Sequence, residues 1–416
     1  MKKRLLCFTM LLTVTISAIT FTNNVKAATK WNTSKSVTKE ENGIKYSAYL
    51  TEDGKESWIY QIKLSKKITK LTLPKEINQA KLTRVGFGKE LYNKGEDEDA
   101  YQNLFGDTIE PWHNCYGDLS NDDKNKQTIE TVAIPSTVNQ LEIATFSGMK
   151  KLKSVVIPEQ TASVPAYTFA KCSALSKVTF SKNMNEIDST AFVKSNQVKT
   201  FSCPKANKTF AVKKGMLTTR SGKTLVLVPN KMKKLTIPSS VKEIKANALN
   251  GSQATSIVIP KSVKKIGAKA LESKKITKVS LSSKNKTYKM ANNCIYRKSN
   301  GTLTAVLVKT KKITIPSKVK VIDDTVSVMG KIGTKNQVHI PKSVKKVVED
   351  WMFFGDSATV YFHGTKPPVI VSKFKGNEFT ALPIFNKVYV PKKAKKTYIK
   401  WAKDRDGLKW NNLHTF

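Results

Sequence analysis

Residues 132–158 read VAIPSTVNQLEIATFSGMKKLKSVVIP, and a block of the form apolar-x-apolar-Pro both opens and closes this stretch. The alternation predicts a short β-strand whose first and third side chains share one face. Proline has no N–H to donate to a sheet, so it predicts the end of the strand. Further copies, three of them with Ser or His in place of the proline, begin at Leu71, Val178, Phe201, Leu235, Ile257, Val279, Ile313, Val338, Val360 and Val388.

The spacing of these copies marks a tandem repeat. From Val132 to Phe201 they follow one another every 23 residues, and in two later places the step grows to 34 residues. The extra residues have an alternating pattern with a turn signal, and Asn-Gly between such runs favours a β-hairpin. The two predicted hairpin insertions are residues 210–228, turning at Ser221-Gly222, and residues 288–308, turning at Asn300-Gly301.

Apolar residues also recur after the strand. Those six positions past the proline are Leu141, Val164, Ile187, Phe210, Ile244, Ile266, Tyr288, Ile322 and Val347. Those eleven positions past it are Phe146, Phe169, Phe192, Leu249 and Leu271, and a further position holds Met149, Cys172, Ser195 and Ser252. A single repeat cannot bury these side chains, whereas stacked repeats join them into continuous ladders. The sequence therefore predicts a mainly β solenoid.

The repeat resembles the BspA-type leucine-rich repeat of secreted and cell-surface proteins. The likeness is clearest in residues 168–175 (TFAKCSAL) and 262–271 (SVKKIGAKAL), in the insertion that ends at Pro229, and in the terminal residues 389–394 (YVPKKA). It covers residues 128–405 well and 44–92 loosely. The resemblance implies a leucine-rich-repeat-type β-solenoid that serves in adhesion or ligand binding and is not an enzyme.

The chain divides into four predicted regions. Residues 1–27 have the basic, apolar and small-residue order of a signal peptide, which is expected to be cleaved after Ala27. Residues 28–127 form an N-terminal cap and first repeat with an acidic insert at about 90–130. The solenoid occupies residues 128–390, and residues 391–416 form a C-terminal cap with a short helix over 392–403. We expect a secreted protein, not an integral membrane protein, that charge can hold at the cell wall.

Four cysteines follow the signal peptide: Cys115, Cys172, Cys203 and Cys294. An even number in an exported chain permits two disulfides. The repeat register places three of them where other repeats have ordinary apolar or small residues, which favours free and mostly buried thiols. Both possibilities remain open from the sequence.

Charge is the strongest signal of a partner. The chain has 73 Lys+Arg against 31 Asp+Glu, a net charge of +42, and only five of the bases are arginines. Lysine attracts polyanions by charge density, whereas arginine suits bidentate recognition. Four positions past the proline, six consecutive repeats carry lysine, and stacked strands would set these lysines about 4.8 Å apart in one line. The predicted ligand-binding lysines are Lys208, Lys242, Lys264, Lys286, Lys320 and Lys345. A solvated turn that tolerates lysine is the alternative interpretation.

The predicted function is binding of a macromolecular, anionic ligand: a cell-wall polymer, a host glycan or an acidic protein. One alternative is a hydrolase or peptidase with its site in the N-terminal cap or acidic insert, and another is non-specific nucleic-acid binding. No cofactor, metal site or catalytic residue is predicted, because His113, His339, His363 and His414 lack ligand spacing. Calcium binding by the acidic insert stays open.

Overall fold

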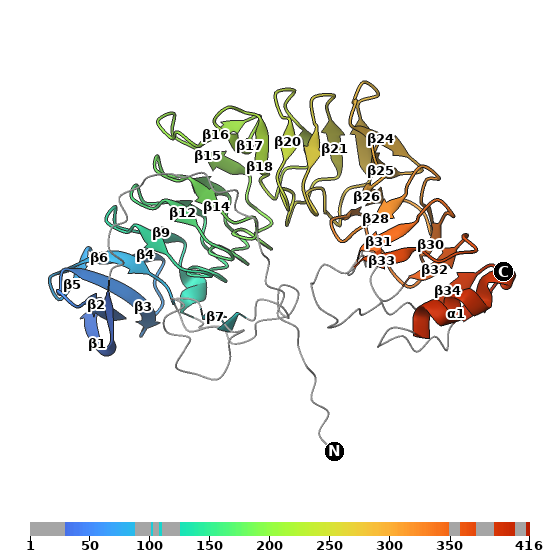
Figure 1. Cartoon of the computed structure of the whole chain (residues 1–416). Coiled ribbons are helices and arrows are strands. Elements are labelled where there is room, and N and C mark those ends of the chain that lie inside the picture. The colour runs from blue at the N-terminus through green and yellow to red at the C-terminus, as the bar shows by residue number, and fades with distance from the viewer. Residues whose placement is uncertain are drawn as a thin grey trace, which may run out of the picture.

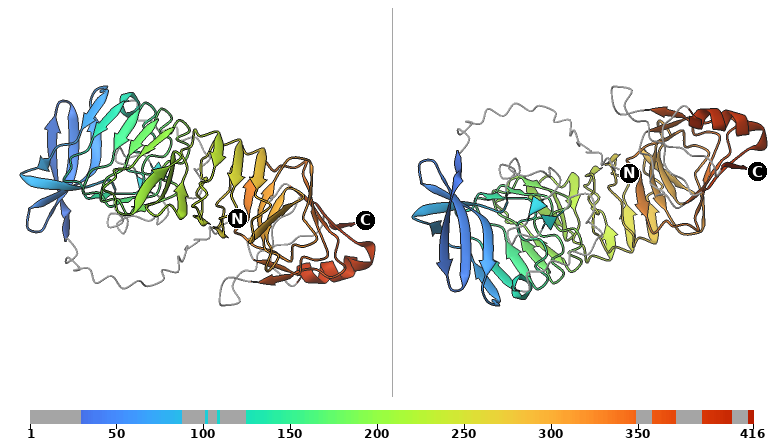
Figure 2. Two further views of the ribbon diagram at one scale, coloured as in Figure 1. Left: turned by 90° about the horizontal axis from the view of Figure 1, so that it is seen from above. Right: turned by 90° about the horizontal axis from the view of Figure 1, so that it is seen from below.

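The computed structural model describes residues 30–87, 101–102, 108–109, 125–348, 358–371, 387–403 and 413–416. The predicted signal peptide, Cys115, His113 and most of the acidic insert lie outside these residues. Short strands stack side by side into an arch, with strand β1 (Trp31–Glu41) at one end and helix α1 (Lys395–Lys403) at the other (Figure 1). From above and below, the arch is an elongated body with these elements at opposite ends (Figure 2).

The N-terminal cap is a sheet that joins the solenoid edge to edge. Its strands run in the order β1-β2-β3-β6-β10, antiparallel at first and parallel from β3 onward, while β5 pairs with β6. After β1 the strands are β2 (Ile44–Thr51), β3 (Glu56–Leu64), β5 (Glu76–Ile77), β6 (Ala80–Val85) and β10 (Gln140–Leu141). The short strands β7 (Tyr101–Gln102) and β8 (Thr108–Ile109) pair with each other, and the 3-10 helix η2 (Lys126–Thr128) precedes the regular repeats.

The apolar-x-apolar-Pro blocks form parallel strands, as predicted, but they belong to three sheets. The first holds β4 (Lys70–Thr72), β9 (Thr131–Ala133), β11 (Ser154–Val156), β13 (Lys177–Thr179) and β15 (Thr200–Ser202). The second holds β19 (Lys234–Thr236), β21 (Ser256–Ile259) and β23 (Lys278–Leu281). The third holds β27 (Lys312–Thr314), β30 (Gln337–Ile340), β32 (Thr359–Phe362), β34 (Lys387–Val390) and β35 (Leu413–Thr415). We call these the first, second and third segments of the solenoid.

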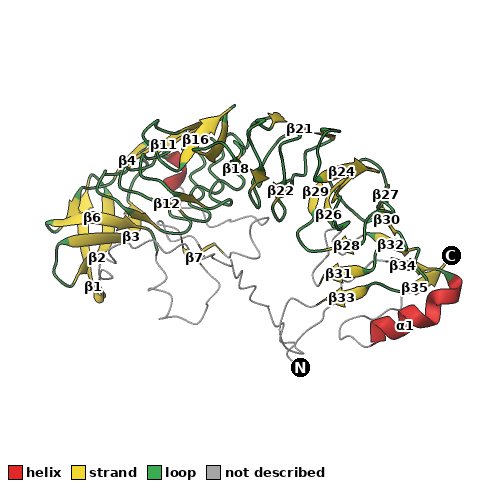
Figure 3. Cartoon of the chain, turned by 45° about the horizontal axis from the view of Figure 1, so that its top comes forward, coloured by secondary structure: helices red, strands yellow, loops and turns green. Residues whose placement is uncertain are grey.

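A second strand follows most blocks and carries the residue six positions past the proline. These strands are β12 (Ser163–Val164), β14 (Glu186–Ile187), β20 (Glu243–Ile244), β22 (Lys265–Ile266), β28 (Val321–Ile322), β31 (Lys346–Val348) and β33 (Val369–Val371), and β29 (Ser327–Met329) lies beyond β28. Figure 3 shows that strands and connecting turns make up most of the chain, with α1 at its C-terminal end.

Both predicted hairpin insertions are present, and each contains one strand more than a hairpin. The first runs β16 (Phe210–Lys213), β17 (Met216–Thr219) and β18 (Thr224–Leu227), and the second runs β24 (Tyr288–Ala291), β25 (Cys294–Arg297) and β26 (Leu303–Leu307). The predicted turn at Ser221-Gly222 closes with a hydrogen bond from Gly222 N to Thr219 O. The additional turns hold Lys214-Gly215 and Asn292-Asn293, all at positive φ. Each insertion coincides with a break between two segments.

The predicted ladders form the core. Every residue predicted six or eleven positions past the proline is buried, as are Met149, Cys172, Ser195 and Ser252. Phe146, Phe169 and Phe192 stack with ring centroids 5.6 and 5.8 Å apart. The buried residues divide into three clusters, which follow the three segments. The solenoid class and its repeat are therefore confirmed.

The C-terminal end closes the third cluster. The 3-10 helix η3 (Lys392–Ala394) leads into α1, so the predicted helix over 392–403 is present. Tyr398 is buried against the Phe362 ring, and its hydroxyl donates to Gly364 O at 3.1 Å. No helix within the described residues is both long and apolar enough to span a membrane.

Candidate ligand-binding surfaces

The six predicted lysines, which we call the lysine row, are all exposed. Within the described part of the chain none of the six forms an ion pair. Lys264 N donates to Lys242 O at 2.7 Å and Lys345 N donates to Lys320 O at 2.9 Å, so each of these two pairs lies on adjacent turns. Their ammonium groups remain available to an anion.

The row is not one evenly spaced line, so the prediction that the six lysines lie in one line at equal steps is wrong. Lys208 precedes β16 and Lys242 precedes β20. In their sheet, strands β17 and β18 lie between β16 and β20. On the far side, Lys320 N donates to Gly301 O at 2.9 Å, so the second insertion separates Lys320 from Lys286. The prediction assumed equal steps between repeats, whereas the inserted strands occupy positions in the same sheets. The structure thus keeps two adjacent lysine pairs, Lys242 with Lys264 and Lys320 with Lys345, and Lys208 and Lys286 belong to neither pair.

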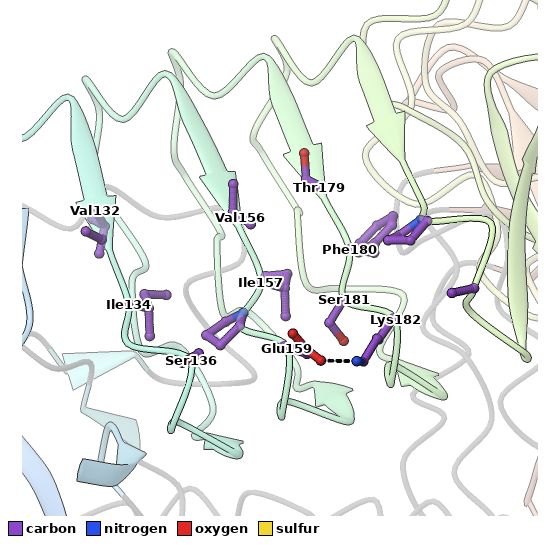
Figure 4. Close-up of a pocket in the computed structure, with 14 residues that line it drawn as sticks. Val132, Ile134, Ser136, Val156, Ile157, Glu159, Thr179, Phe180, Ser181 and Lys182 are labelled. Carbon is purple, nitrogen blue, oxygen red and sulfur yellow. Dashed lines mark ion pairs between the residues drawn. The ribbon is translucent and has the colours of Figure 1, made fainter. Parts of the chain in front are cut away.

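An apolar groove of about 650 Å³ crosses the proline ends of β9, β11 and β13 in the first segment (Figure 4). Its lining includes Ile134, Ile157 and Phe180. The charged side chains among the lining residues are Glu159 and Lys182, and these form an ion pair with each other at the rim. The groove therefore offers no unpaired charge to an anionic ligand.

A polar cavity of about 480 Å³ lies where the first and second segments meet. Glu272 is the one acidic side chain among the residues that line it, and burial raises the pKa of this carboxyl despite the nearby Lys269 and Lys274. Glycosidic hydrolysis ordinarily needs two carboxyl groups at a fixed separation. The residues that line this cavity therefore offer no such pair of carboxyl groups.

A row of four rings lies on the outer face of the third segment. The strand register pairs His339 with Tyr361, Tyr361 with Tyr389, and Tyr389 with His414. The ring centroids are 4.4, 4.6 and 5.0 Å apart, with interplanar angles of 5°, 10° and 27°. We call these four residues the aromatic row.

His363 and Phe416 flank the aromatic row. His339 Nδ1 and His363 Nε2 are hydrogen-bonded at 2.9 Å, and the Phe416 ring centroid lies 5.2 Å from that of His363. Burial, Lys312 and His363 lower the pKa of His339 to about 4, while burial and Lys312 lower the pKa of His363. The sequence shows only that these histidines lack ligand spacing, and it did not relate His339 to His363, which the structure brings into hydrogen-bond contact. For the aromatic row the missed signal is the register, because the outward residue of one block meets the outward residue of the next.

Within the described residues all three cysteines are free. Cys172 and Cys294 are buried, and burial raises the pKa of each thiol to about 12. Cys203 is half-buried, and burial also raises its pKa. The expectation of free, mostly buried thiols is confirmed for these three residues. No group of three or more His, Cys, Asp or Glu side chains within the described ranges is placed to hold a metal ion.

The stacked parallel strands and apolar ladders define a leucine-rich-repeat-type solenoid. The family model for the BspA type leucine rich repeat region, in six copies, matches residues 124–214 and 229–359. These ranges cover more than half of the chain, and the chain belongs to this family. The resemblance drawn from the sequence is confirmed.

Solved structures with similarity to the chain include three bacterial proteins. A leucine rich cell surface protein from Faecalibacterium prausnitzii is 14% identical, with 84% of this chain and 98% of that one covered and a TM-score of 0.35. The pneumococcal vaccine antigen PcpA is 15% identical, with 91% and 97% covered and a TM-score of 0.38. A leucine-rich repeat protein from Eubacterium ventriosum is 14% identical, with 86% and 94% covered and a TM-score of 0.37. No curated protein matches the chain.

Proposed function

We propose that the protein is an extracellular or cell-surface interaction module that binds an anionic macromolecule through the exposed lysines of its solenoid. One observation carries this proposal: the lysine row is exposed and has no ion-pair partner in the described part of the chain. Residues 205–346, which contain the row, hold 33 Lys+Arg against four Asp+Glu. Such a surface attracts polyanions over long range.

Family membership supports the coarser part of the proposal, a role in interaction at the cell surface. Solenoids present extended surfaces to large ligands, because each repeat contributes the same outward position. Anionic cell-wall polymers, host glycans and acidic proteins all fit the charge. The chemistry they share is a dense series of carboxylate, phosphate or sulfate groups.

The two adjacent lysine pairs are the best positions for a test. Lys242, Lys264, Lys320 and Lys345 would be changed together to Gln, and affinity for poly-L-glutamate would be measured across a range of salt concentrations. Counterion release predicts a weaker dependence on salt, by about 0.7 to 0.9 in the slope of log K against log salt for each lysine that no longer neutralises an anionic group. We expect the variant to bind more weakly at low salt and its slope to fall by about three units.

The matched control changes four exposed lysines of the C-terminal end to Gln: Lys392, Lys393, Lys395 and Lys396. Both variants have the same net charge, so a difference between them reports position. Equal losses of affinity would show that bulk charge alone attracts the polymer and that the lysine row is not a site. Duplex DNA serves as a second probe. Tighter binding to DNA than to every carboxylate polymer would favour the nucleic-acid alternative.

A further inference from the structure

The solenoid does not require aromatic residues on its outer face. In the first and second segments the position equivalent to the aromatic row is occupied by small or β-branched residues, which are Thr72, Ala133, Val156, Thr179, Ser202, Thr236, Val258 and Ser280. The third segment begins in the same way, with Thr314 paired to His339. The rings therefore gather on the last four strands of the sheet. Clustered apolar surface that folding does not need marks a binding site.

The arrangement of the rings determines what they can contact. Since the four rings stack on one another, their faces are largely covered within the row, and a ligand would meet their edges. Phe416 is tilted by 50° to Tyr361 and 55° to His363, so it stands outside the stack, and its side chain is 52% exposed. The His414 ring is exposed and belongs to β35, the edge strand of its sheet. These two rings offer apolar faces beside the polar edges of the row.

The local charge favours an anion over a metal cation. Lys312 lies close enough to lower the pKa of both His339 and His363, and it would repel a cation at the same place. The 2.9 Å hydrogen bond also occupies one nitrogen of each imidazole, Nδ1 of His339 and Nε2 of His363. Lys387 begins strand β34, which carries Tyr389, and is exposed. A carboxylate near the row would therefore be attracted to two lysines.

We propose that the aromatic row, with His363 and Phe416, is a saccharide subsite that makes the protein prefer acidic polysaccharides to other polyanions. This inference rests on the proposed function and deepens it. Phenol and imidazole groups both donate and accept hydrogen bonds, which matches sugar hydroxyls. The apolar faces of Phe416 and His414 match the C–H faces of a sugar ring, and Lys312 and Lys387 match uronic-acid carboxylates. A polypeptide of acidic residues offers the carboxylates without the ring faces or hydroxyls.

The experiment compares polygalacturonate with poly-L-glutamate of similar length and charge. The variant carries Tyr361→Thr, Tyr389→Thr and Phe416→Ala, which remove both phenols of the aromatic row and the exposed Phe416 ring. We expect about a tenfold loss of affinity for polygalacturonate and less than a twofold change for poly-L-glutamate. The matched control, Val156→Thr with Val258→Thr, changes the same outward position in the first and second segments and should leave both affinities unchanged.

The outcomes distinguish a failure of the proposed anionic interaction from a failure of the saccharide subsite. If the unaltered protein binds neither polymer, or binds both without dependence on salt, the proposed function fails. If it binds both and the triple variant loses the two affinities equally, or loses neither, the saccharide subsite is refuted while the anionic interaction stands. Tyr361 and Tyr389 pack against neighbouring rings, so the triple variant also loses packing contacts. His414→Ala is therefore a second variant, because it removes an exposed ring on the edge strand. It should weaken polygalacturonate binding alone, with an unchanged melting temperature.

Discussion

At the scale of single residues, position within the strand decides what a side chain does. Ile259 is fully buried, whereas Val258, one residue earlier, is 43% exposed. The same alternation leaves Val156 63% exposed beside the buried Val155 and Ile157. Burial of the inward residues could be predicted from the sequence because the period of a strand fixes it. The contact between Tyr389 and His414 could not, since His414 lies on β35, which belongs to no apolar-x-apolar-Pro block.

Ile259→Asp is expected to unfold at least the neighbouring repeats. Ile259 pairs with Leu281 on the inward face, and an unpaired carboxylate there costs several kcal/mol. Val258→Asp should be mild, because that side chain already faces solvent. Thermal denaturation followed by circular dichroism measures both, and equal losses of melting temperature would show that the strand register is wrong.

His339 predicts a dependence of stability on pH. Its pKa in the folded protein is about 4, below the ordinary 6.5, so the unfolded chain binds more protons between these values. The neutral imidazole is favoured in the fold by burial and by Lys312 and His363 beside it. Stability should therefore fall as pH drops from 6.5 toward 4 and change no further from this cause below 4.

The measurement compares melting temperatures at pH 7 and pH 4.5. His339→Gln should show a smaller difference between the two pH values than the unaltered protein. If His339→Gln shows the same difference as the unaltered protein, His339 does not titrate as described.

At the scale of elements, the cap and the solenoid meet through a buried ion pair. Arg84 on β6 donates to Glu142, just after β10, at 2.7 Å, and its guanidinium lies 3.8 Å from the centre of the Trp58 ring. The two side chains are only 4% and 12% exposed. Nothing in the sequence identified this contact, because the two residues are far apart in the chain and belong to no repeated motif. It fixes how the cap sits against the first segment.

Glu142→Gln should destabilise this junction, because it removes a carboxylate that accepts a hydrogen bond from the buried Arg84 guanidinium. Glu130→Gln is the matched control. Glu130 pairs with Lys153 at 2.6 Å, but the two side chains are 35% and 63% exposed, and solvent screens such a pair so that it contributes little. Urea denaturation of the two variants provides the comparison. A junction that tolerates both changes equally would contradict the role assigned to the Arg84 pair.

The sequence predicted only part of the structure of the two insertions. Their hairpin character was predictable, since Gly222 and Gly301 supply the positive φ that a tight turn needs. The additional turn in each insertion was not, because Phe210 and Tyr288 fit the ladder pattern and also begin a strand of the insertion. This difference also changes the geometry of the lysine row. Two extra strands in each insertion interrupt the lysine row, and the number of residues between repeats does not reveal that.

At the scale of the whole molecule, the repeat determines the class, and the proposed saccharide subsite lies at a departure from it. The family, the strands and the buried ladders follow from regular spacing, so the sequence predicts them. The aromatic row belongs to a departure confined to the last strands, and the cavity at Glu272 lies at a break between segments. A ligand long enough to reach from Lys242 to Tyr389 would cross the second break, and would depend on the relative orientation of the second and third segments.

The division into three sheets and three cores also governs how the molecule yields to force. Within a segment, neighbouring strands share a continuous ladder, whereas at each break the ladder of main strands is interrupted and an insertion takes its place. A solenoid pulled between its ends while attached to a surface would then lengthen in stages, one segment at a time. The aromatic row and the two lysine pairs, where we propose that the ligand binds, lie on the second and third segments, so extension of the first segment alone would leave them in place.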